Sequence, residues 1–381
     1  MTPKERVEAA FKKQPTDKVP VNHRGFSSKA ASHILKREAF IGGGIQKWRE
    51  VKSLYEGWHD EYLERSFKDA VDLARITGQD LVRPQYWRAP RKPTRKIDDN
   101  TYLFENSSDE NTWRVLKYDP GTEQSYDGWY RPRVLTSDEV RRNVDANLKT
   151  VNAYTPKDES QEFALKAQKL LGNNYAIELS CATVLPSVHT EIIWLELMLL
   201  DPGLVKEYIS IQLTRVKRNV EHFAKHGFRY FLGGHDFATD TGTFYSPQLF
   251  NELMLPALKQ VSDCCCANNG YHIFASDGNL WPVADMLFEK AGVHGYYEID
   301  RHAGMRVEDL RVKHPNLTCL GNISSWTLSQ GSKEDVITET RVCIDAAKKY
   351  NGIILGVSNQ VLCDTPSENI DALLETIENY R

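Results

Sequence analysis

The feature that most constrains the fold is a repeated pairing, in the second half of the chain, of a short apolar run with a cluster of polar side chains. Sequence typical of helices separates these pairs. The six clusters are Ser180-Cys181, His235-Asp236, His272 with Ser276-Asp277, Glu298-Asp300, Asn322-Ser324-Ser325 and Ser358-Asn359. A strand followed by a helix, repeated, builds a parallel sheet with helices outside it. If that sheet closes into a barrel, every strand ends at one mouth, and we expect the polar clusters to converge there.

Eight short apolar segments can serve as the strands of such a barrel. They are residues 18–22, 80–83, 175–181, 228–232, 270–274, 295–299, 317–320 and 352–356. The clearest helix between them begins at Asp201-Pro202, where Asp caps the helix and Pro occupies its first turn, and ends at Gly227. Eight strands joined by helices is the number that a (β/α)8 TIM barrel requires. We therefore predict an α/β fold in which residues 1–381 form a single TIM-barrel domain.

One segment interrupts this rhythm. Within residues 84–135, the stretches 101–104 and 113–116 alternate like the two strands of a hairpin around a polar turn. We predict a β-hairpin insertion near the barrel mouth. Aromatic rings in this segment and near the strand ends would suit stacking against an apolar or aromatic substrate, although packing beneath the insertion explains any single ring equally well. The set comprises Trp87, Trp129, Tyr130, Trp281, Tyr297 and Trp326.

Composition excludes several classes of partner. The net charge is −4 and no basic stripe is present, so we expect no nucleic-acid partner. No run approaches the roughly 18 apolar residues of a membrane span, and the N-terminus lacks the apolar core of a signal peptide. The seven cysteines show no disulfide-framework spacing, which favours a reducing cytoplasm. Nucleotide-binding glycine loops, a serine-hydrolase elbow and Cys-x-x-Cys pairs are also absent from the sequence.

The polar clusters supply candidates for catalysis. His272 lies in the fifth predicted strand, where a neutral imidazole could bind a metal or act as a base; a core histidine bonded to a neighbour is the alternative. Asp277 lies at the exit of that strand. His235 and Asp236 follow the fourth strand, where Asp236 could instead be a loop residue that makes a turn.

A metal site is a further hypothesis. Glu252 lies on the helix after the fourth strand, and it is either an exposed position or a side chain that faces the barrel. In the second case, Asp236, Glu252 and His272 could share a divalent cation, for which oxygen and nitrogen ligands favour zinc. The run Cys264–Cys266 cannot form such a site, because consecutive helical residues point about 100° apart.

Several segments, in this order, carry a likeness to a known family. They are 1–7 and 17–21, then 235–237 and 246–250 with Glu252 and Pro256, then 271–272 with 276–279, then 321–323, and finally 364–366 with 368–369. On these segments the chain resembles the uroporphyrinogen decarboxylase superfamily, and within it the cobalamin-dependent methyltransferases of the O-demethylase type more than the decarboxylases. The likeness covers nearly the whole chain. It implies a TIM barrel with its pocket at the C-terminal mouth.

Two positions depart from patterns of that family. Where true decarboxylases carry an arginine-rich stretch that grips substrate carboxylates, residues 22–26 contain Arg24 alone, so we do not expect porphyrinogen decarboxylation. Thiol-methylating relatives bind zinc through His-x-Cys and a later Cys, but here Ile273 and Phe274 follow His272, and the later position is Asn359. The branches that act on methoxylated aromatics resemble the chain better, and Asp236, Glu252 and His272 fall near their metal ligands.

The resemblance implies a methyltransferase that moves a methyl group from a small donor to a corrinoid on a separate protein. The expected catalytic residues are His272, Asp277, Asp236 and Glu298, and zinc would be held by His272, Glu252 and Asp236. The expected substrate-binding residues are His235, Trp281, Asn322, Asn359, Arg24 and Tyr297. The alternatives are a cofactor-independent decarboxylase, in which Arg24 and Arg83 anchor the substrate, and a non-catalytic binding protein. A homodimer is left open.

Overall fold

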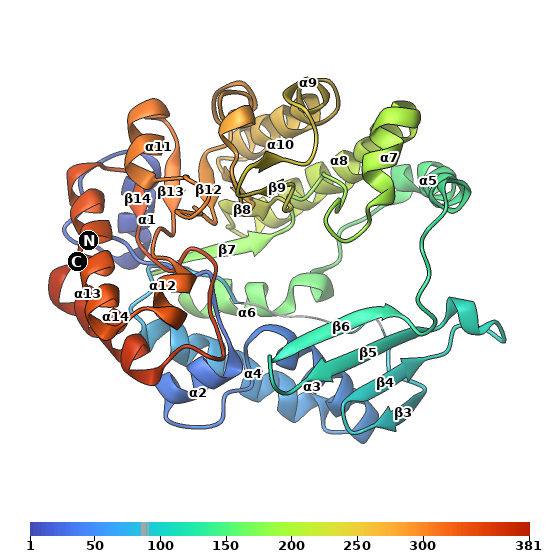
Figure 1. The fold of residues 1–381 in the computed structure, drawn as a ribbon, viewed down its shortest axis with the longest axis horizontal. Coiled ribbons are helices and arrows are strands. Elements are labelled where there is room, and N and C mark those ends of the chain that lie inside the picture. The colour runs from blue at the N-terminus through green and yellow to red at the C-terminus, as the bar shows by residue number, and fades with distance from the viewer. Residues whose placement is uncertain (85–88, 90) are drawn as a thin grey trace.

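A curled parallel sheet lies at the centre of the computed structural model, which describes residues 1–84, 89 and 91–381 (Figure 1). Its seven strands pair in the order β14-β13-β12-β11-β8-β7-β2, and every pairing is parallel. The strands are Leu81–Val82 (β2), Ala176–Ser180 (β7), Tyr230–Gly233 (β8), Tyr271–Ala275 (β11), Gly295–Tyr297 (β12), Thr318–Leu320 (β13) and Ile353–Ile354 (β14).

The segment around Val21 closes this sheet into a barrel. Val21 forms a parallel bridge with Leu355, next to β14, and the backbone N–H of Leu81 in β2 donates to the Val21 carbonyl at 3.3 Å. Gly356 beside this seam has no room for a side chain, because a Cβ there would lie 1.6 Å from the Asn22 carbonyl oxygen. The predicted first strand thus completes the circle, and the predicted (β/α)8 barrel is confirmed.

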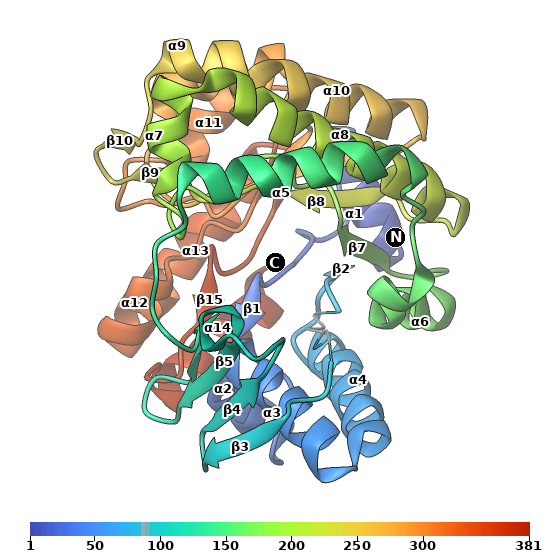
Figure 2. The ribbon, with the colours of Figure 1, turned by 90° about the vertical axis from the view of Figure 1, so that its right-hand side faces the viewer.

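Helices cover the outside of the barrel (Figures 1 and 2). The α-helices are Pro3–Phe11 (α1), Ser28–Leu35 (α2), Gly43–Glu56 (α3), His59–Ile76 (α4), Ser137–Thr150 (α5), Glu162–Leu171 (α6), Ile193–Leu200 (α7), Pro202–Lys225 (α8), Pro247–Leu249 (α9), Leu255–Ala267 (α10), Val307–Lys313 (α11), Ser325–Gln330 (α12), Lys333–Lys349 (α13) and Ser367–Tyr380 (α14). The long helix α8 begins as predicted: the Asp201 carboxylate accepts from the Leu204 N–H at 3.2 Å, and Pro202 stands in the first turn.

Shorter elements complete the outer layer. They are the 3₁₀ turns Glu110–Thr112 (η1), Val151–Ala153 (η2), Asp158–Gln161 (η3) and Trp281–Val283 (η5), the π-helical stretches Phe250–Met254 (η4) and Asp285–Lys290 (η6), and the strand pairs Gly25–Phe26 (β1) with Gln360–Val361 (β15) and Ala238–Thr239 (β9) with Gly242–Thr243 (β10). The parallel β1–β15 pair extends the seam between the first and last strands at the mouth end.

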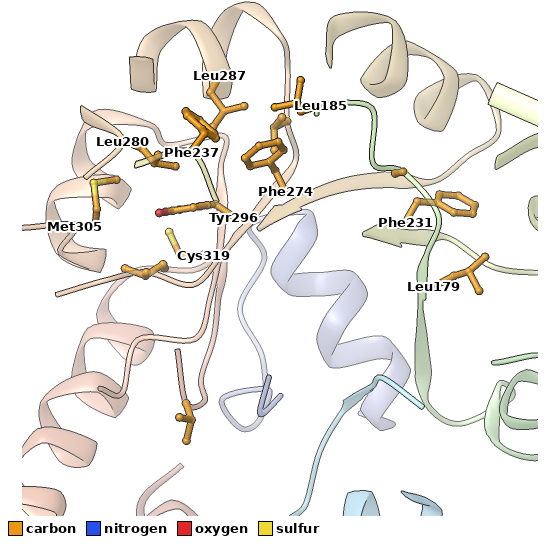
Figure 3. Packing of buried hydrophobic residues seen from close by; sticks show 14 of the residues in the cluster. Leu179, Leu185, Phe231, Phe237, Phe274, Leu280, Leu287, Tyr296, Met305 and Cys319 are labelled. Carbon is orange, nitrogen blue, oxygen red and sulfur yellow. The ribbon is translucent and has the colours of Figure 1, made fainter. Parts of the chain in front are cut away.

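Apolar side chains fill both faces of the barrel wall. Ile273 and Ala275 belong to the inner cluster, together with Tyr297 and Leu320. Phe274 lies between them on the strand and belongs to the outer cluster, where the strands meet the helices (Figure 3). Successive residues of a strand point to opposite faces, and a barrel covered by helices buries both. This alternation decides which polar side chains face the interior.

The predicted insertion is confirmed, and it is larger than one hairpin. Four antiparallel strands pair in sequence order: Arg95–Asp98 (β3), Thr101–Phe104 (β4), Arg114–Asp119 (β5) and Gln124–Trp129 (β6). The sheet lies against α3 (Figure 2), where the rings of Trp48 and Tyr118 stack with centroids 5.1 Å apart. Every residue of β3 is exposed, so this strand lacks the apolar alternation by which a sequence reveals a half-buried strand.

Cys264–Cys266 lie on α10 and differ in burial: Cys265 is buried and Cys266 is exposed, as expected for consecutive positions on a partly buried helix. No helix in the part of the chain that the structure describes has the length and apolar character needed to cross a membrane.

Candidate functional site

Three carboxylates from three neighbouring strand ends meet at the mouth of the barrel. Asp236 follows β8, Asp277 follows β11 and Glu298 follows β12. Their ligand oxygens all lie within 4.8 Å of one another. The Asp277 backbone N–H donates to Asp236 Oδ1 at 3.0 Å, and Asn359, beyond β14, donates from Nδ2 to Asp277 Oδ2 at 2.7 Å. We call Asp236, Asp277 and Glu298 the carboxylate cluster.

Two partly buried arginines lie beside this cluster. Arg24, which follows the first strand, donates from Nε to Glu298 Oε1 at 2.8 Å, and its guanidinium carbon lies 5.2 Å from the centroid of the Tyr297 ring. Arg83 follows β2, and its Nε lies 3.5 Å from Oε1 of Glu178. Glu178 is buried in the middle of β7. The mouth therefore contains alternating positive and negative groups rather than one uniform charge.

A cavity of about 390 Å³ opens beside these groups. The described residues that line it are Arg24, Gly25, Gly43, Gly44, Lys47, Arg83, Gln124, Ser125, Glu298, Asn359 and Gln360. Lys47 belongs to α3, and Gln124 and Ser125 belong to β6 of the inserted sheet, so the insertion forms one wall. Each of the three cationic side chains in this lining has a carboxylate partner: Arg24 pairs with Glu298, Arg83 with Glu178 and Lys47 with Asp127. Because the cations outnumber the carboxylates within the described lining, which contains no aromatic ring, we expect a small polar anion as the occupant.

Burial has a strong effect on Asp277. Loss of solvent raises the pKa of its carboxyl to about 8, and the negative charges of Glu298, Asp236 and Asp300 add to the rise. The Asn359 amide acts in the opposite direction, because its hydrogen bond stabilises the ionised form. Asp277 therefore keeps its proton at neutral pH, which a general acid requires.

The other titratable groups at the mouth shift for similar reasons. Burial raises the pKa of the Glu178 carboxyl, while the positive charge of Arg83 opposes the rise. The pKa of Arg83 falls to about 10, first through burial and then through the positive charge of Arg24, so Arg83 remains charged at neutral pH. Burial also lowers the pKa of His235, and the neighbouring His189, whose ring centroid lies 6.4 Å away, lowers it further. His235 is therefore a neutral imidazole.

The predicted position of His272 requires a correction. Its side chain points away from the barrel interior: Nδ1 lies 2.9 Å from the Ser262 hydroxyl of α10, and the residue is fully buried. Burial lowers the pKa of the imidazole to about 3. The inner face of β11 carries Ile273 and Ala275, so alternation along the strand sends His272 to the outer face. His272 is therefore a core histidine hydrogen-bonded to a neighbour, which is the alternative that the sequence allowed.

The predicted zinc ligands are consequently not brought together. Glu252 is an exposed residue of η4 whose Oε1 accepts from Gln248 Nε2 at 2.9 Å. Of the predicted trio, only Asp236 reaches the carboxylate cluster. The cluster could hold a divalent cation, but through oxygens alone, a ligand set that suits Mg²⁺ or Mn²⁺ better than zinc.

The predicted substrate-binding residues lie in different places. Arg24 and Asn359 line the cavity, and Tyr297 lies beneath Arg24, with its hydroxyl bonded to the Asn22 side chain. Asn322 is fully buried, and within the described structure its amide atoms have no partner. Trp281 lies in the outer layer, where its Nε1 donates to the Gly304 carbonyl at 3.0 Å.

Among the remaining aromatic candidates, those that the structure describes do not line the cavity. Trp326 is 59% exposed, and Trp129 lies under the guanidinium groups of Arg114 and Arg133. Tyr130 pairs with the Trp113 ring at 5.8 Å. Trp87 lies outside the described residues.

Sequence reasoning missed two members of the site. Glu178 is a charged residue in the middle of a predicted apolar strand, and that pattern could have marked it as an inward-facing functional group. Lys47 gave no signal, because a lysine on an amphipathic helix is ordinary and only the fold brings α3 to the mouth.

Comparison with known proteins identifies the family. Residues 181–380 match the family model described as Uroporphyrinogen decarboxylase (URO-D). A solved structure described as a methyltransferase from Methanosarcina mazei aligns over 100% of this chain and 99% of its own, with 16% identity and a TM-score of 0.63, which supports the barrel fold. A D-psicose 3-epimerase structure aligns over 61% of this chain and 85% of its own at 9% identity, with a TM-score of only 0.34. No curated protein matches the sequence. Because the family model covers more than half of the chain, the protein belongs to the uroporphyrinogen decarboxylase family.

Proposed function

We propose that the protein is a methyltransferase that takes a methyl group from a small methoxylated acid and passes it to a corrinoid on a separate protein. The observation that carries the proposal is the partly buried Asp277, which holds its proton at neutral pH beside a cation-lined cavity. Family membership and the full-length likeness to a protein described as a methyltransferase support the reaction class.

The residues at the mouth have distinct roles in this proposal. Arg24, Arg83 and Lys47 would hold the carboxylate of the donor, and their charges would orient its methoxy group towards the carboxylate cluster. As the bond between methyl carbon and oxygen breaks, the departing oxygen would take the proton of Asp277 and leave as an alcohol or phenol. Asp236 and Asn359 would keep the Asp277 carboxyl in position.

The corrinoid, when bound, supplies the nucleophile that accepts the methyl group. A divalent cation could be held by the oxygens of Asp236, Asp277 and Glu298, where it would supply Lewis-acid chemistry to the departing oxygen. A cation there would displace the Asp277 proton, so the two modes of assistance are alternatives. Metal analysis of the purified protein, with and without chelation, distinguishes them.

The test uses free reduced cobalamin as the acceptor and methoxybenzoates as donors, with methylcobalamin formation followed by absorbance. Asp277→Asn should lower kcat by at least about a hundredfold, since general acid catalysis contributes roughly 10²–10⁴. Asp240→Asn, in an exposed loop, is the matched control and should leave the rate unchanged. Wild-type turnover in Asp277→Asn would refute the proposed acid.

A decarboxylase is the second candidate, and the arginines favour it. Arg24 and Arg83 would anchor a substrate carboxylate, a second carboxylate would leave as carbon dioxide, and Asp277 would protonate the resulting carbanion. Carbon dioxide release without any corrinoid would favour this lyase, whereas methyl transfer without carbon dioxide release favours the methyltransferase.

A further inference from the structure

A second group of metal-ligating side chains lies in the outer layer of the barrel and shares no residue with the carboxylate cluster or with the described lining of the cavity. Asp158 of η3 and His222 of α8, with His226 directly after that helix, present ligand atoms that all lie within 4.8 Å of one another. Nε2 of His222 is 2.6 Å and Nε2 of His226 is 3.7 Å from the same oxygen, Asp158 Oδ1. Nothing in the proposed reaction uses these residues.

The helix arranges the two imidazoles. Residues four apart lie on the same face of a helix, so His222 and His226 are neighbours, and their ring centroids are 5.1 Å apart. Both rings also contact the buried Phe223, with centroids 4.9 and 6.3 Å from it, which limits their freedom. His226 is the C-cap of α8, where the negative end of the helix dipole favours a cation.

The distances fit a zinc ion. With bonds of about 2.0–2.1 Å, the ligand atoms of a tetrahedral zinc site lie about 3.3 Å apart. The two separations of 2.6 and 3.7 Å from Asp158 Oδ1 fall on either side of that value, so small side-chain rotations would accommodate the ion. All three side chains are 31–51% exposed, which leaves a fourth coordination position open to water.

We propose that Asp158, His222 and His226 form a zinc-binding site that joins the connection between α5 and α6 to helix α8. The same connection is already held by α8: Arg218 donates to the carbonyls of Asn152 and Tyr154 at 2.9 and 2.5 Å. A bound zinc ion would add a second link between this connection and α8, at Asp158 and nearer the C-terminal end of the helix. Since the site lies outside the barrel mouth, it would serve stability rather than methyl transfer.

The test measures zinc binding by the chelator-treated full-length protein, using dialysis with metal analysis and thermal unfolding. The wild type should bind one zinc equivalent that raises Tm, and His226→Ala should weaken its affinity by at least about tenfold, as expected when a site loses a ligand. The matched control is His33→Ala: His33 also pairs with an exposed aspartate, Asp371, at 2.8 Å, but belongs to no group of three ligands among the described residues.

The same titration with Asp236→Asn distinguishes this site from zinc bound at the carboxylate cluster. This variant should still bind one equivalent of zinc, because Asp158, His222 and His226 are unchanged. Copper(II) provides a measurement on the wild type alone: the electron paramagnetic resonance spectrum should show two coordinated nitrogens. Absence of zinc-dependent stabilisation in the wild type, unchanged affinity in His226→Ala, or a copper spectrum without coordinated nitrogen would each overturn the proposal.

Discussion

At the scale of single residues, burial determines the chemistry of the mouth. Asp277 and Glu298 carry the same functional group, yet Arg24 pairs with Glu298, whereas Asp277 faces two other carboxylates and a neutral amide. A carboxyl without a cationic partner in a poorly solvated site retains its proton. The environment therefore makes Asp277 an acid, whereas Glu298 is held in an ion pair with Arg24.

Asp277→Asn tests this difference through pH. The Asp277 pKa of about 8 lies above the roughly 3.9 of an unfolded aspartate. As the pH rises from about 4 to 8, the unfolded chain releases a proton that the folded protein retains, so this residue progressively destabilises the wild type. We expect the stability of Asp277→Asn relative to the wild type to rise between pH 4 and pH 8, by up to about 5 kcal/mol.

Urea unfolding at the two pH values measures this stability difference. The activity of the wild type should also fall above about pH 8, as the acid loses its proton. A stability difference that is the same at pH 4 and pH 8 would show that Asp277 titrates normally.

Arg24→Gln tests the buried ion pair. Its removal leaves Glu298 without its cation in a site where both side chains are at most 15% exposed, so we expect a loss of about 3 kcal/mol in the free energy of unfolding. The double variant Arg24→Gln/Glu298→Gln should recover part of that stability, because it removes the uncompensated charge. It should not recover binding of an anionic donor, measured as KM. A double variant with wild-type KM would exclude Arg24 from substrate binding.

Residue types at the strand ends were predictable, but their orientations were not. The sequence indicated Asp236, Asp277 and Glu298 as mouth residues, and the structure brings them together, although their catalytic roles stay predictions. The prediction for His272 is wrong because β11 is buried on both faces, so no pattern in the sequence shows which alternate positions of the strand face inward. In a strand with one polar and one apolar face, the alternation itself shows which positions face inward.

At the scale of elements, close contact between neighbouring strand ends brings the cluster together. Gly234 follows β8 with φ of +115°, and a Cβ there would lie 2.1 Å from the Ala275 carbonyl oxygen of β11. Only glycine fits a site with that backbone angle and that contact. The approach brings the loop that carries Asp236 to the exit of β11, where Asp277 lies.

Gly234→Ala should therefore lower the free energy of unfolding by about 3 kcal/mol, because the strand ends must separate. Gly57→Ala is the matched control: its φ is +87°, but nothing lies within 4 Å of a Cβ, so it should cost only about 1 kcal/mol. Urea unfolding measures both. Equal costs would mean that backbone conformation, and not the contact with Ala275, makes glycine necessary at position 234.

At the scale of the whole molecule, Asp80 joins three distant parts of the chain at the barrel seam. Its Oδ1 accepts from Arg6 at 2.9 Å, and its Oδ2 accepts from the Val21 N–H and from Arg381, both at 2.9 Å. The side chain is 1% exposed. Both ends of the chain and the closing strand therefore depend on one carboxylate.

Asp80→Ala should lower the free energy of unfolding by about 3 kcal/mol, because it leaves two arginines without their shared buried partner. Asp17→Ala is the control: Asp17 also binds Arg6, at 2.7 Å, but is 42% exposed, so its loss should cost less than about 1 kcal/mol. The comparison uses urea midpoints at constant pH, and similar costs for both variants would contradict a seam held by burial.

The single-domain organisation stays a prediction, which calorimetry tests by the presence of one cooperative transition.

The sequence by itself determined the eight barrel strands, the helices between them and the end at which polar groups gather, because these follow from periodicities and turn signals that are local in the chain. Only the tertiary structure decided which face of β11 points inward, which carboxylate keeps a proton, and that α3 and the inserted sheet supply a cavity wall. Those outcomes depend on burial and on charges brought close by folding, such as the pairing of Arg24 with Glu298, 274 residues apart in the chain.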